Sequence, residues 1–232
     1  MTRRLVLFDI DGTLMLSAGA GRRAILAALE EHVADLTPLR RVRFDGKTDP
    51  QIVAELLAAG GDPEPAEPVR VARVLERYVA LLERELTGPD HGAHPMPGVP
   101  EILDFLQGHE AAVLGLVTGN VAPGARLKLA AARIDPEQFV VGAFGSDHAR
   151  RAELPPIAAR RAEPFFGRVP TGTEVIIIGD TPEDVCCAES IGARTVAVAT
   201  GSYSAETLAL AGADIVLPDL SDVPRSLEAI LS

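Results

Sequence analysis

Short runs of apolar residues alternate along this chain with stretches whose apolar residues recur at helical spacing. The runs lie within residues 5–8, 111–119, 139–145, 174–180, 194–200 and 213–220. Continuous runs rich in β-branched residues are typical of strands that are buried on both faces of a sheet. Strands that alternate with helices pair in parallel through right-handed crossovers. The sequence therefore predicts an α/β fold built on a doubly wound parallel sheet.

The segment between the first and second runs is predicted to be a helical insertion. Its apolar residues recur at helical spacing, at Ile25, Leu29, Val33 and Leu36, at Ile52, Val53, Leu56 and Leu57, and at Val71, Val74, Leu75, Tyr78 and Leu82. Stretches rich in glycine and proline at 60–70 and 87–100 interrupt this pattern. We expect an α/β core of residues 1–16 and 95–232 and a helical cap of residues 17–94.

The composition argues against several classes of protein. The chain has 232 residues, of which 47% are hydrophobic, so it can bury a sizeable core. A net charge of -11 argues against nucleic acid or an anionic membrane surface as a partner, because both require a basic face. The two cysteines, Cys186 and Cys187, are adjacent and thus poorly placed for a disulfide framework. With no apolar stretch of membrane-spanning length and no leader-type cleavage site, the protein is expected to be cytoplasmic.

Polar and acidic residues follow three of the predicted strands directly. They are Asp9 and Asp11, the segment 118–120, and Asp180 with Asp184. In doubly wound sheets the ligand lies outside the carboxyl ends of the strands. A carboxylate buried there is costly unless it is paired or bound to a metal, and Mg²⁺ prefers oxygen ligands. The pattern predicts a Mg²⁺ site; the alternative is a set of strand-end turns with solvated acids.

Three of these segments carry a resemblance to a known family. FDIDGTL (8–14), VTGN (117–120) and IIIGDTPEDV (176–185) resemble the first, second and fourth motifs of the haloacid dehalogenase superfamily. The likeness is greatest to the phosphatases that resemble phosphoglycolate phosphatase, in which a helical cap follows the first motif. GKTDPQIVAELL (46–57) and PGVPEIL (97–103) are similar to that branch as well.

The resemblance implies a role for each residue of the first motif. Asp9 would attack the phosphorus of a phosphate ester and form an aspartyl-phosphate, which divides one difficult displacement into two easier ones. Asp11 would be the general acid for the leaving alcohol and then the base for the hydrolytic water. Gly12 would allow the tight turn that follows, and Thr13 would add a hydroxyl or amide near the phosphate.

The second and fourth motifs imply phosphate and metal contacts. Thr118 would donate its hydroxyl, and Gly119 and Asn120 their backbone N–H groups, to the phosphoryl oxygens. The implied ligands of Mg²⁺ are Asp9, Asp11, Asp180 and Asp184, the last either as a direct ligand or as a partner that orients bound water.

The third motif departs from the family pattern. The family has a lysine there, often before a proline, whereas the corresponding segment 145–162 contains no lysine. We assign the cationic role to Arg151, with Arg150 as the competing choice, because a guanidinium can neutralise phosphate and bridge to a carboxylate. A solvated surface arginine is the alternative.

The predicted activity is Mg²⁺-dependent hydrolysis of a small phosphorylated metabolite, similar to that of phosphoglycolate phosphatase. Lys47, Arg22 and Arg23 of the insertion are candidates to bind a second anionic group of the substrate, although Lys47 could equally be a solvated turn residue. Asp11 argues against a dehalogenase, which does not need to protonate an alcohol. A sugar phosphomutase similar to β-phosphoglucomutase and a non-catalytic phosphate-binding module remain as alternatives.

Overall fold

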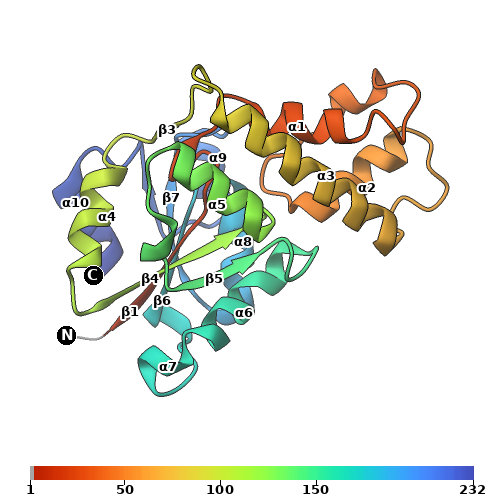
Figure 1. Cartoon of the computed structure of the whole chain (residues 1–232). Helices are drawn as coiled ribbons and strands as arrows, with labels where there is room; N and C mark the ends of the chain where they lie inside the picture. The colour runs from red at the N-terminus through yellow and green to blue at the C-terminus, as the bar shows by residue number, and fades with distance from the viewer. Residues whose placement is uncertain (1–2) are drawn as a thin grey trace.

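The computed structural model describes residues 3–232, within which six strands form a parallel sheet (Figure 1). Its strands are β1 (Arg4–Phe8), β4 (Ala112–Thr118), β5 (Val141–Phe144), β6 (Val175–Gly179), β7 (Arg194–Val198) and β8 (Ile215–Leu217). Their order across the sheet is β5-β4-β1-β6-β7-β8, so β1 lies between β4 and β6. Leu5 is opposite Val113 on one side and Val175 on the other. Each predicted apolar run contributes a strand, and the predicted doubly wound fold is confirmed.

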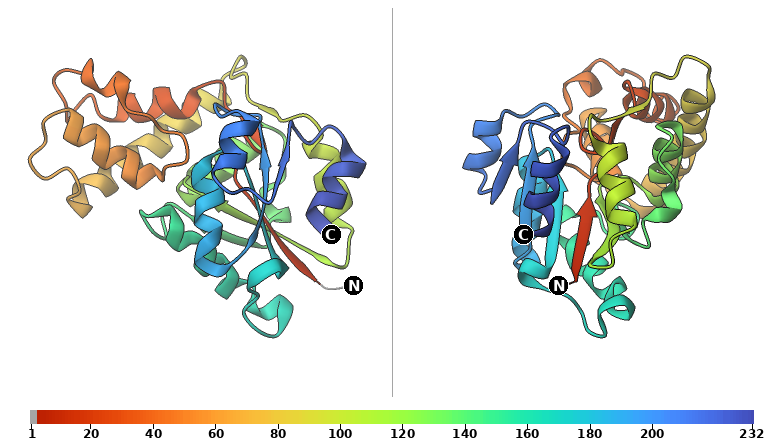
Figure 2. Two further views of the ribbon diagram at one scale, coloured as in Figure 1. Left: turned by 180° about the vertical axis from the view of Figure 1, so that it is seen from behind. Right: turned by 90° about the vertical axis from the view of Figure 1, so that its left-hand side faces the viewer.

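Helices cover both faces of this sheet (Figure 2). Alternate residues of β1 point to opposite faces. Val6 and Phe8 pack with α4 (Val99–Gln107), α5 (Ala122–Ala131) and α10 (Val223–Leu231). Leu5 and Leu7 pack with α6 (Leu154–Arg161) and α8 (Pro182–Ala188).

The remaining helices of this part are α7 (Glu163–Phe166), α9 (Ala205–Leu210) and the 3₁₀ turns Pro136–Gln138, Arg151–Glu153, Gly172–Glu174 and Glu189–Ile191. Of the helices within residues 3–232, none is long and apolar enough to cross a membrane.

A separate group of helices extends from one end of the sheet (Figure 1). It contains α1 (Ala20–Ala28), the 3₁₀ helix η1 (Pro38–Arg41), α2 (Asp49–Ala59) and α3 (Pro68–Thr87). These elements share a hydrophobic cluster of their own, to which Val121 contributes from the start of α5. The two connections to the sheet run side by side, because β2 (Met15–Leu16) pairs antiparallel with β3 (His94–Pro95). We call residues 17–94 the helical unit below.

The first helix of this unit is shorter than the apolar spacing predicts. The spacing extends one helical face to Val33 and Leu36, whereas α1 ends at Ala28. The N–H groups of His32 and Val33 donate to the carbonyl of Leu29 at 2.8 and 3.0 Å and form a turn after the helix. Val33 is nevertheless buried, as its spacing predicts, although the helix does not continue to it.

Candidate active site

Three neighbouring strands bring the predicted site residues to one edge of the sheet. Asp9 follows β1, Thr118 is the last residue of β4, and Asp180 follows β6. The N–H group of Asp9 donates to the carbonyl of Ile178 at 2.9 Å, which extends the pairing of β1 with β6 up to the site. Parallel pairing of adjacent strands therefore brings side chains that are distant in the sequence to the same edge of the sheet.

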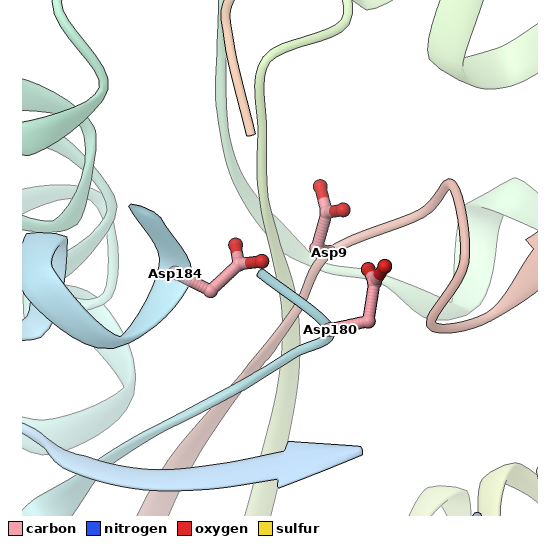
Figure 3. Close-up of side chains that lie close together, drawn as sticks. All are labelled: Asp9, Asp180 and Asp184. Carbon is pink, nitrogen blue, oxygen red and sulfur yellow. The ribbon is translucent and has the colours of Figure 1, made fainter. Parts of the chain in front are cut away.

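Asp9, Asp180 and Asp184 form a buried group of carboxylates, as Figure 3 shows. One oxygen from each of the three side chains lies within 4.8 Å of the others. Burial raises the pKa of Asp9 to about 6, against the lowering effect of Arg151. Burial, together with Asp184 and Asp9, also raises the pKa of Asp180 well above its ordinary value. This concentration of negative charge in a desolvated place suits a divalent cation with oxygen ligands. The group could therefore hold a metal.

Asp11 lies outside this group of three carboxylates. Its Oδ2 atom accepts from the Nδ2 group of Asn120 at 2.8 Å and from the ammonium of Lys128 at 2.6 Å. The Asp11 side chain is 41% exposed, whereas the three grouped carboxylates are buried. Asp11 thus lies beside Asp9 with a different set of partners, and its role as a metal ligand stays a prediction.

The position of Asp184 follows from the way α8 begins. Thr181 caps this helix, and its hydroxyl accepts from the N–H group of Asp184 at 3.2 Å. In return, Oδ2 of Asp184 accepts from the N–H and the hydroxyl of Thr181 at 3.0 and 2.7 Å. This reciprocal capping box holds the carboxylate still. The other oxygen, Oδ1, pairs with Arg151.

Arg151 lies at the site, whereas Arg150 points away from it. The guanidinium of Arg151 is 3.0 Å from Oδ1 of Asp9 and also pairs with Asp184. Although burial alone would lower it, the two carboxylates raise the pKa of Arg151 well above its ordinary value. Within the described residues, the buried Nε of Arg151 has no hydrogen-bond partner, which leaves a donor for a bound anion. Arg150 instead pairs with Glu153, and its side chain is 75% exposed.

Gly12 and Thr13 shape the turn after β1. Gly12 has a φ of +85°, and a Cβ atom there would lie 2.7 Å from Cγ of Asp180. Glycine is therefore required both by the backbone conformation and by the closeness of Asp180. The hydroxyl of Thr13 donates to Oδ1 of Asp180 at 3.0 Å. In this structure the Thr13 hydroxyl orients an acidic side chain, a contact that the resemblance did not suggest.

Asn120 links the segment after β4 to the first motif. Its Nδ2 group donates to Oγ1 of Thr118 at 2.9 Å as well as to Asp11. Thr118 is fully buried. The carbonyl of the next residue, Gly119, accepts a hydrogen bond from the N–H group of Asp49 in the helical unit. The three predicted phosphate contacts thus lie together next to Asp9 and Asp11, where they line the same cavity.

Lys128 is a site residue that the sequence analysis missed. Its Nζ donates to Oδ2 of Asp11 and to Oδ1 of Asn120, both at 2.6 Å, and its side chain is only 6% exposed. Lys128 lies on α5, away from any recognised motif. The available signal was its spacing, because the buried Ala125 lies three residues before it on α5, and the buried Ala132, which caps the helix, lies four residues after it.

Asp49 was also missed, and it joins the helical unit to the sheet. Its N–H group donates to the carbonyl of Gly119 at 2.7 Å, and its Oδ2 accepts from the N–H of Val121 at 2.8 Å. Burial raises the pKa of Asp49 to about 6, against the lowering effect of Lys128. These contacts hold the start of α2 over the strand ends and enclose a cavity of about 220 Å³.

The predicted basic residues of the helical unit are engaged within the protein. Lys47 lines the cavity and pairs with Glu55. Arg22 also lines the cavity, but its guanidinium donates to the carbonyls of Arg40 and Val42 and lies 4.3 Å from the centre of the Phe44 ring. The half-exposed Arg23 pairs with Glu85 and does not line the cavity, so its predicted substrate contact is not supported. Successive residues of a helix point in different directions, so Arg23 points away from the cavity that Arg22 lines.

Replacing Gly119 with alanine is expected to separate the helical unit from the sheet. A Cβ atom at this position would lie 2.8 Å from the carbonyl carbon of Lys47 and closer still to its oxygen, and backbone cannot move aside cheaply. We expect a loss of about 1–3 kcal/mol in the free energy of unfolding. We also expect kcat/KM to fall by about tenfold or more, because the start of α2 would no longer be held at the strand ends.

Thermal unfolding and phosphatase assays measure both effects. Gly108→Ala is the matched control, because Gly108 has a φ of -83° and a Cβ atom there would meet only ordinary contacts, at 3.8 Å and beyond. Equal stability and equal activity in the two variants would show that the close approach at Gly119 has no consequence.

Comparisons with known proteins agree with this geometry. A family model described as HAD-hydrolase-like matches residues 152–223. The chain is 28% identical over 230 residues to a phosphoglycolate phosphatase of Caulobacter vibrioides, a match that covers 98% of this chain and 92% of that protein. It is 29% identical over 230 residues to a phosphoglycolate phosphatase of Rhodospirillum rubrum, with 95% and 89% covered. The similarity therefore extends over the sheet and the helical unit alike.

A solved structure has the same fold over the whole chain. A hydrolase from Pseudomonas syringae superposes with a TM-score of 0.74 at 24% identity, and the match covers 100% of both chains. At this level of identity the likeness is one of fold.

Proposed function

Because the chain belongs to the haloacid dehalogenase-like hydrolases, we propose that it is a Mg²⁺-dependent phosphatase that acts on a small phosphate monoester through an aspartyl-phosphate at Asp9. One observation carries the proposal. Asp9 lies close to both the cationic Arg151 and the acidic Asp180, and a second carboxylate with different hydrogen-bond partners, Asp11, follows two residues later. A nucleophile, a cation for the phosphoryl group and a separate acid are the parts that this reaction requires.

In the first step a carboxylate oxygen of Asp9 forms a bond to phosphorus. The bond between phosphorus and the ester oxygen breaks, and its electron pair stays on that oxygen. The oxygen takes a proton from the carboxylic acid form of Asp11 and leaves as an alcohol. Arg151 offsets the negative charge shared by Asp9 and the phosphoryl group, and the N–H groups at Gly119 and Asn120 are the proposed donors to its oxygens.

In the second step Asp11, now a carboxylate, takes a proton from water as the water oxygen forms a bond to phosphorus. The bond between phosphorus and Asp9 breaks, which releases inorganic phosphate and restores the Asp9 carboxylate. Asp11 ends the cycle protonated, as it began. The sum of the two steps is one ester and one water converted into one alcohol and one phosphate.

Asp9, Asp180 and Asp184 would hold the Mg²⁺ ion. The donor set fits, because the three side chains offer carboxylate oxygens within 4.8 Å of one another and the positive charge beside them comes from Arg151. When bound, the ion would offset the repulsion between the carboxylates and an incoming phosphate. Thr13 and Thr181 keep Asp180 and Asp184 oriented for this role.

The helical unit, residues 17–94, would act as a cap that closes over the substrate and opens for release. The paired segments β2 and β3 are the proposed hinges, since they are the connections between this unit and the core of residues 1–16 and 95–232. The hydrogen bonds of Asp49 to Gly119 and Val121 would be made in the closed state. Closure would exclude bulk water from the reacting groups.

A small substrate with a short leaving group suits this cavity. Its volume is about 220 Å³, and the helical unit supplies Lys47 and Arg22 to its lining. The phosphoglycolate phosphatases of Caulobacter vibrioides and Rhodospirillum rubrum, both similar over nearly the whole chain, favour phosphoglycolate as the first candidate. A second anionic group on the substrate would have to compete with Glu55 for Lys47.

Phosphate release from a panel of monoesters tests the proposal. The panel includes phosphoglycolate, glycerol phosphates and hexose phosphates, each assayed with Mg²⁺ and with a chelator. We expect metal-dependent release, with highest kcat/KM for phosphoglycolate. Isomerisation of a hexose phosphate without release would indicate a phosphomutase instead. Phosphate binding without any turnover would indicate a non-catalytic module.

A further inference from the structure

Lys128 is a buried cation beside the proposed catalytic groups, and the mechanism above gives it no role. It lies on α5 and lines the same cavity as Asp9 and Asp11. Its side chain is 6% exposed. Burying an ammonium group is costly unless the group is paired, so its contacts determine where it is held.

Those contacts form a closed triangle of hydrogen bonds. The ammonium of Lys128 donates to Oδ2 of Asp11 and to Oδ1 of Asn120, both at 2.6 Å. The Nδ2 group of Asn120 completes the triangle by donating to the same Oδ2 atom of Asp11 at 2.8 Å. Both donors to Asp11 thus use Oδ2, which leaves Oδ1 as the oxygen for proton transfer.

The surroundings of Lys128 restrict its movement. A Cβ atom added to Gly21, on α1, would lie 3.3 Å from Nζ of Lys128 and 3.7 Å from the hydroxyl of Tyr78, so α1 packs closely there. Burial alone would lower the pKa of Lys128, but Asp11, Tyr78 and Asp49 together raise it above its ordinary value. The ammonium is therefore a fixed positive charge, held by both the sheet side and the helical unit.

Asp11 itself has little else to hold it. It lies in the turn where the chain leaves β1, and its side chain is 41% exposed. An exposed carboxylate in such a turn would ordinarily sample several rotamers. A general acid must lie within hydrogen-bond reach of the leaving oxygen, and a misplacement of about 1 Å can cost about 10²-fold in rate.

We propose that Lys128 is a positioning residue that, with Asn120, holds Asp11 in the orientation required for both proton transfers. This inference rests on the proposed function, because it assigns Lys128 a part in the same reaction. The helical unit contributes through Gly21, whose lack of a side chain leaves room for the ammonium.

Lys128→Met removes the charge and both hydrogen bonds at nearly constant volume. Two substrates distinguish the steps. p-Nitrophenyl phosphate has a leaving group that needs no proton, whereas glycerol phosphate requires Asp11 as an acid. With p-nitrophenyl phosphate we expect a burst of one nitrophenolate per enzyme and then slow turnover, because only hydrolysis of the aspartyl-phosphate still needs Asp11. With glycerol phosphate we expect kcat to fall by about 10²-fold without a burst and with little change in KM.

Three further variants make the result specific. Lys128→Arg keeps the charge and should recover part of the lost kcat. In an Asp11→Asn background, Lys128→Met should cause no further loss, since its effect acts through Asp11. Arg126→Met is the matched control, because Arg126 is an exposed cation on the same helix that pairs with Glu137, and its activity should equal that of the wild type.

Removing Lys128 also leaves the buried Asp49 without its nearby cation. If thermal unfolding shows that Lys128→Met does not fold, the double variant Asp49→Asn/Lys128→Met removes both charges and is assayed in its place. Its reference is the single variant Asp49→Asn. The burst with p-nitrophenyl phosphate is expected in the double variant and not in this reference.

The outcomes separate this inference from the proposed function. A burst in the Lys128 variant, absent from the wild type, supports the positioning role. Two results overturn the inference and leave the phosphatase proposal in place. In one, the wild type is active and Lys128→Met has the same kcat. In the other, Lys128→Met loses activity through KM alone and shows no burst. A wild type that releases no phosphate from either substrate overturns both.

Discussion

Asp9→Asn is expected to lose phosphatase activity by about 10⁴-fold or more. The amide has nearly the same shape as the carboxylate but cannot form the aspartyl-phosphate. Arg151 keeps its partner Asp184 in this variant, so no buried cation is left unpaired and the fold should be retained. Phosphate release under saturating Mg²⁺ measures the loss. Mass spectrometry of the wild type, stopped in acid during turnover, should locate the phosphoryl group on Asp9.

Asp104→Asn is the control for this substitution. Asp104 is an exposed carboxylate on α4, remote from the strand ends, and its removal makes the same change in net charge. Its activity should equal that of the wild type. If Asp9→Asn were as active as Asp104→Asn, another residue would have to be the nucleophile and the assignment of Asp9 would be wrong.

The fold and the strand-end residues could be predicted because their signals are local in the sequence. Asp9 and Asp180 each come directly after a buried apolar strand, where a carboxylate is costly without a ligand. Parallel pairing then brings such ends together whatever the lengths of the intervening helices. The capping box at Thr181 and Asp184 is similarly local, since both partners lie within one helical turn.

Lys128 and Asp49 could not be predicted with the same reasoning. Each takes its role from a contact with a distant segment, Lys128 with Asp11 and Asp49 with Val121. A lysine on a helix is usually solvated, and an aspartate at a helix start usually serves the helix itself. Only the packing of α5 and α2 around the strand ends turns these two residues inward. The choice between Arg150 and Arg151 depended on packing in the same way.

The second large effect is expected when the metal is removed. A chelator should reduce phosphate release to background, and added Mg²⁺ should restore it. Asp180→Asn should lower activity by about 10²-fold or more at saturating Mg²⁺, because one charged ligand is lost from the group of three carboxylates. Activity that persists unchanged in chelator would contradict the metal requirement.

The same carboxylates should make stability depend on pH and on the metal. Burial raises the pKa of Asp9 to about 6 from an ordinary 3.8, so the folded state binds protons more tightly than the unfolded state. In chelator, the free energy of unfolding should therefore fall as the pH rises from about 4 through about 6.

Mg²⁺ at a hundred times its Kd should restore about 2.7 kcal/mol of the free energy of unfolding at neutral pH, measured as a rise in Tm. Asp180→Asn, in which one repelling charge is absent, should be more stable than the wild type in chelator and should respond little to Mg²⁺. A wild-type Tm that is the same with and without Mg²⁺ would show that the three carboxylates do not bind the ion.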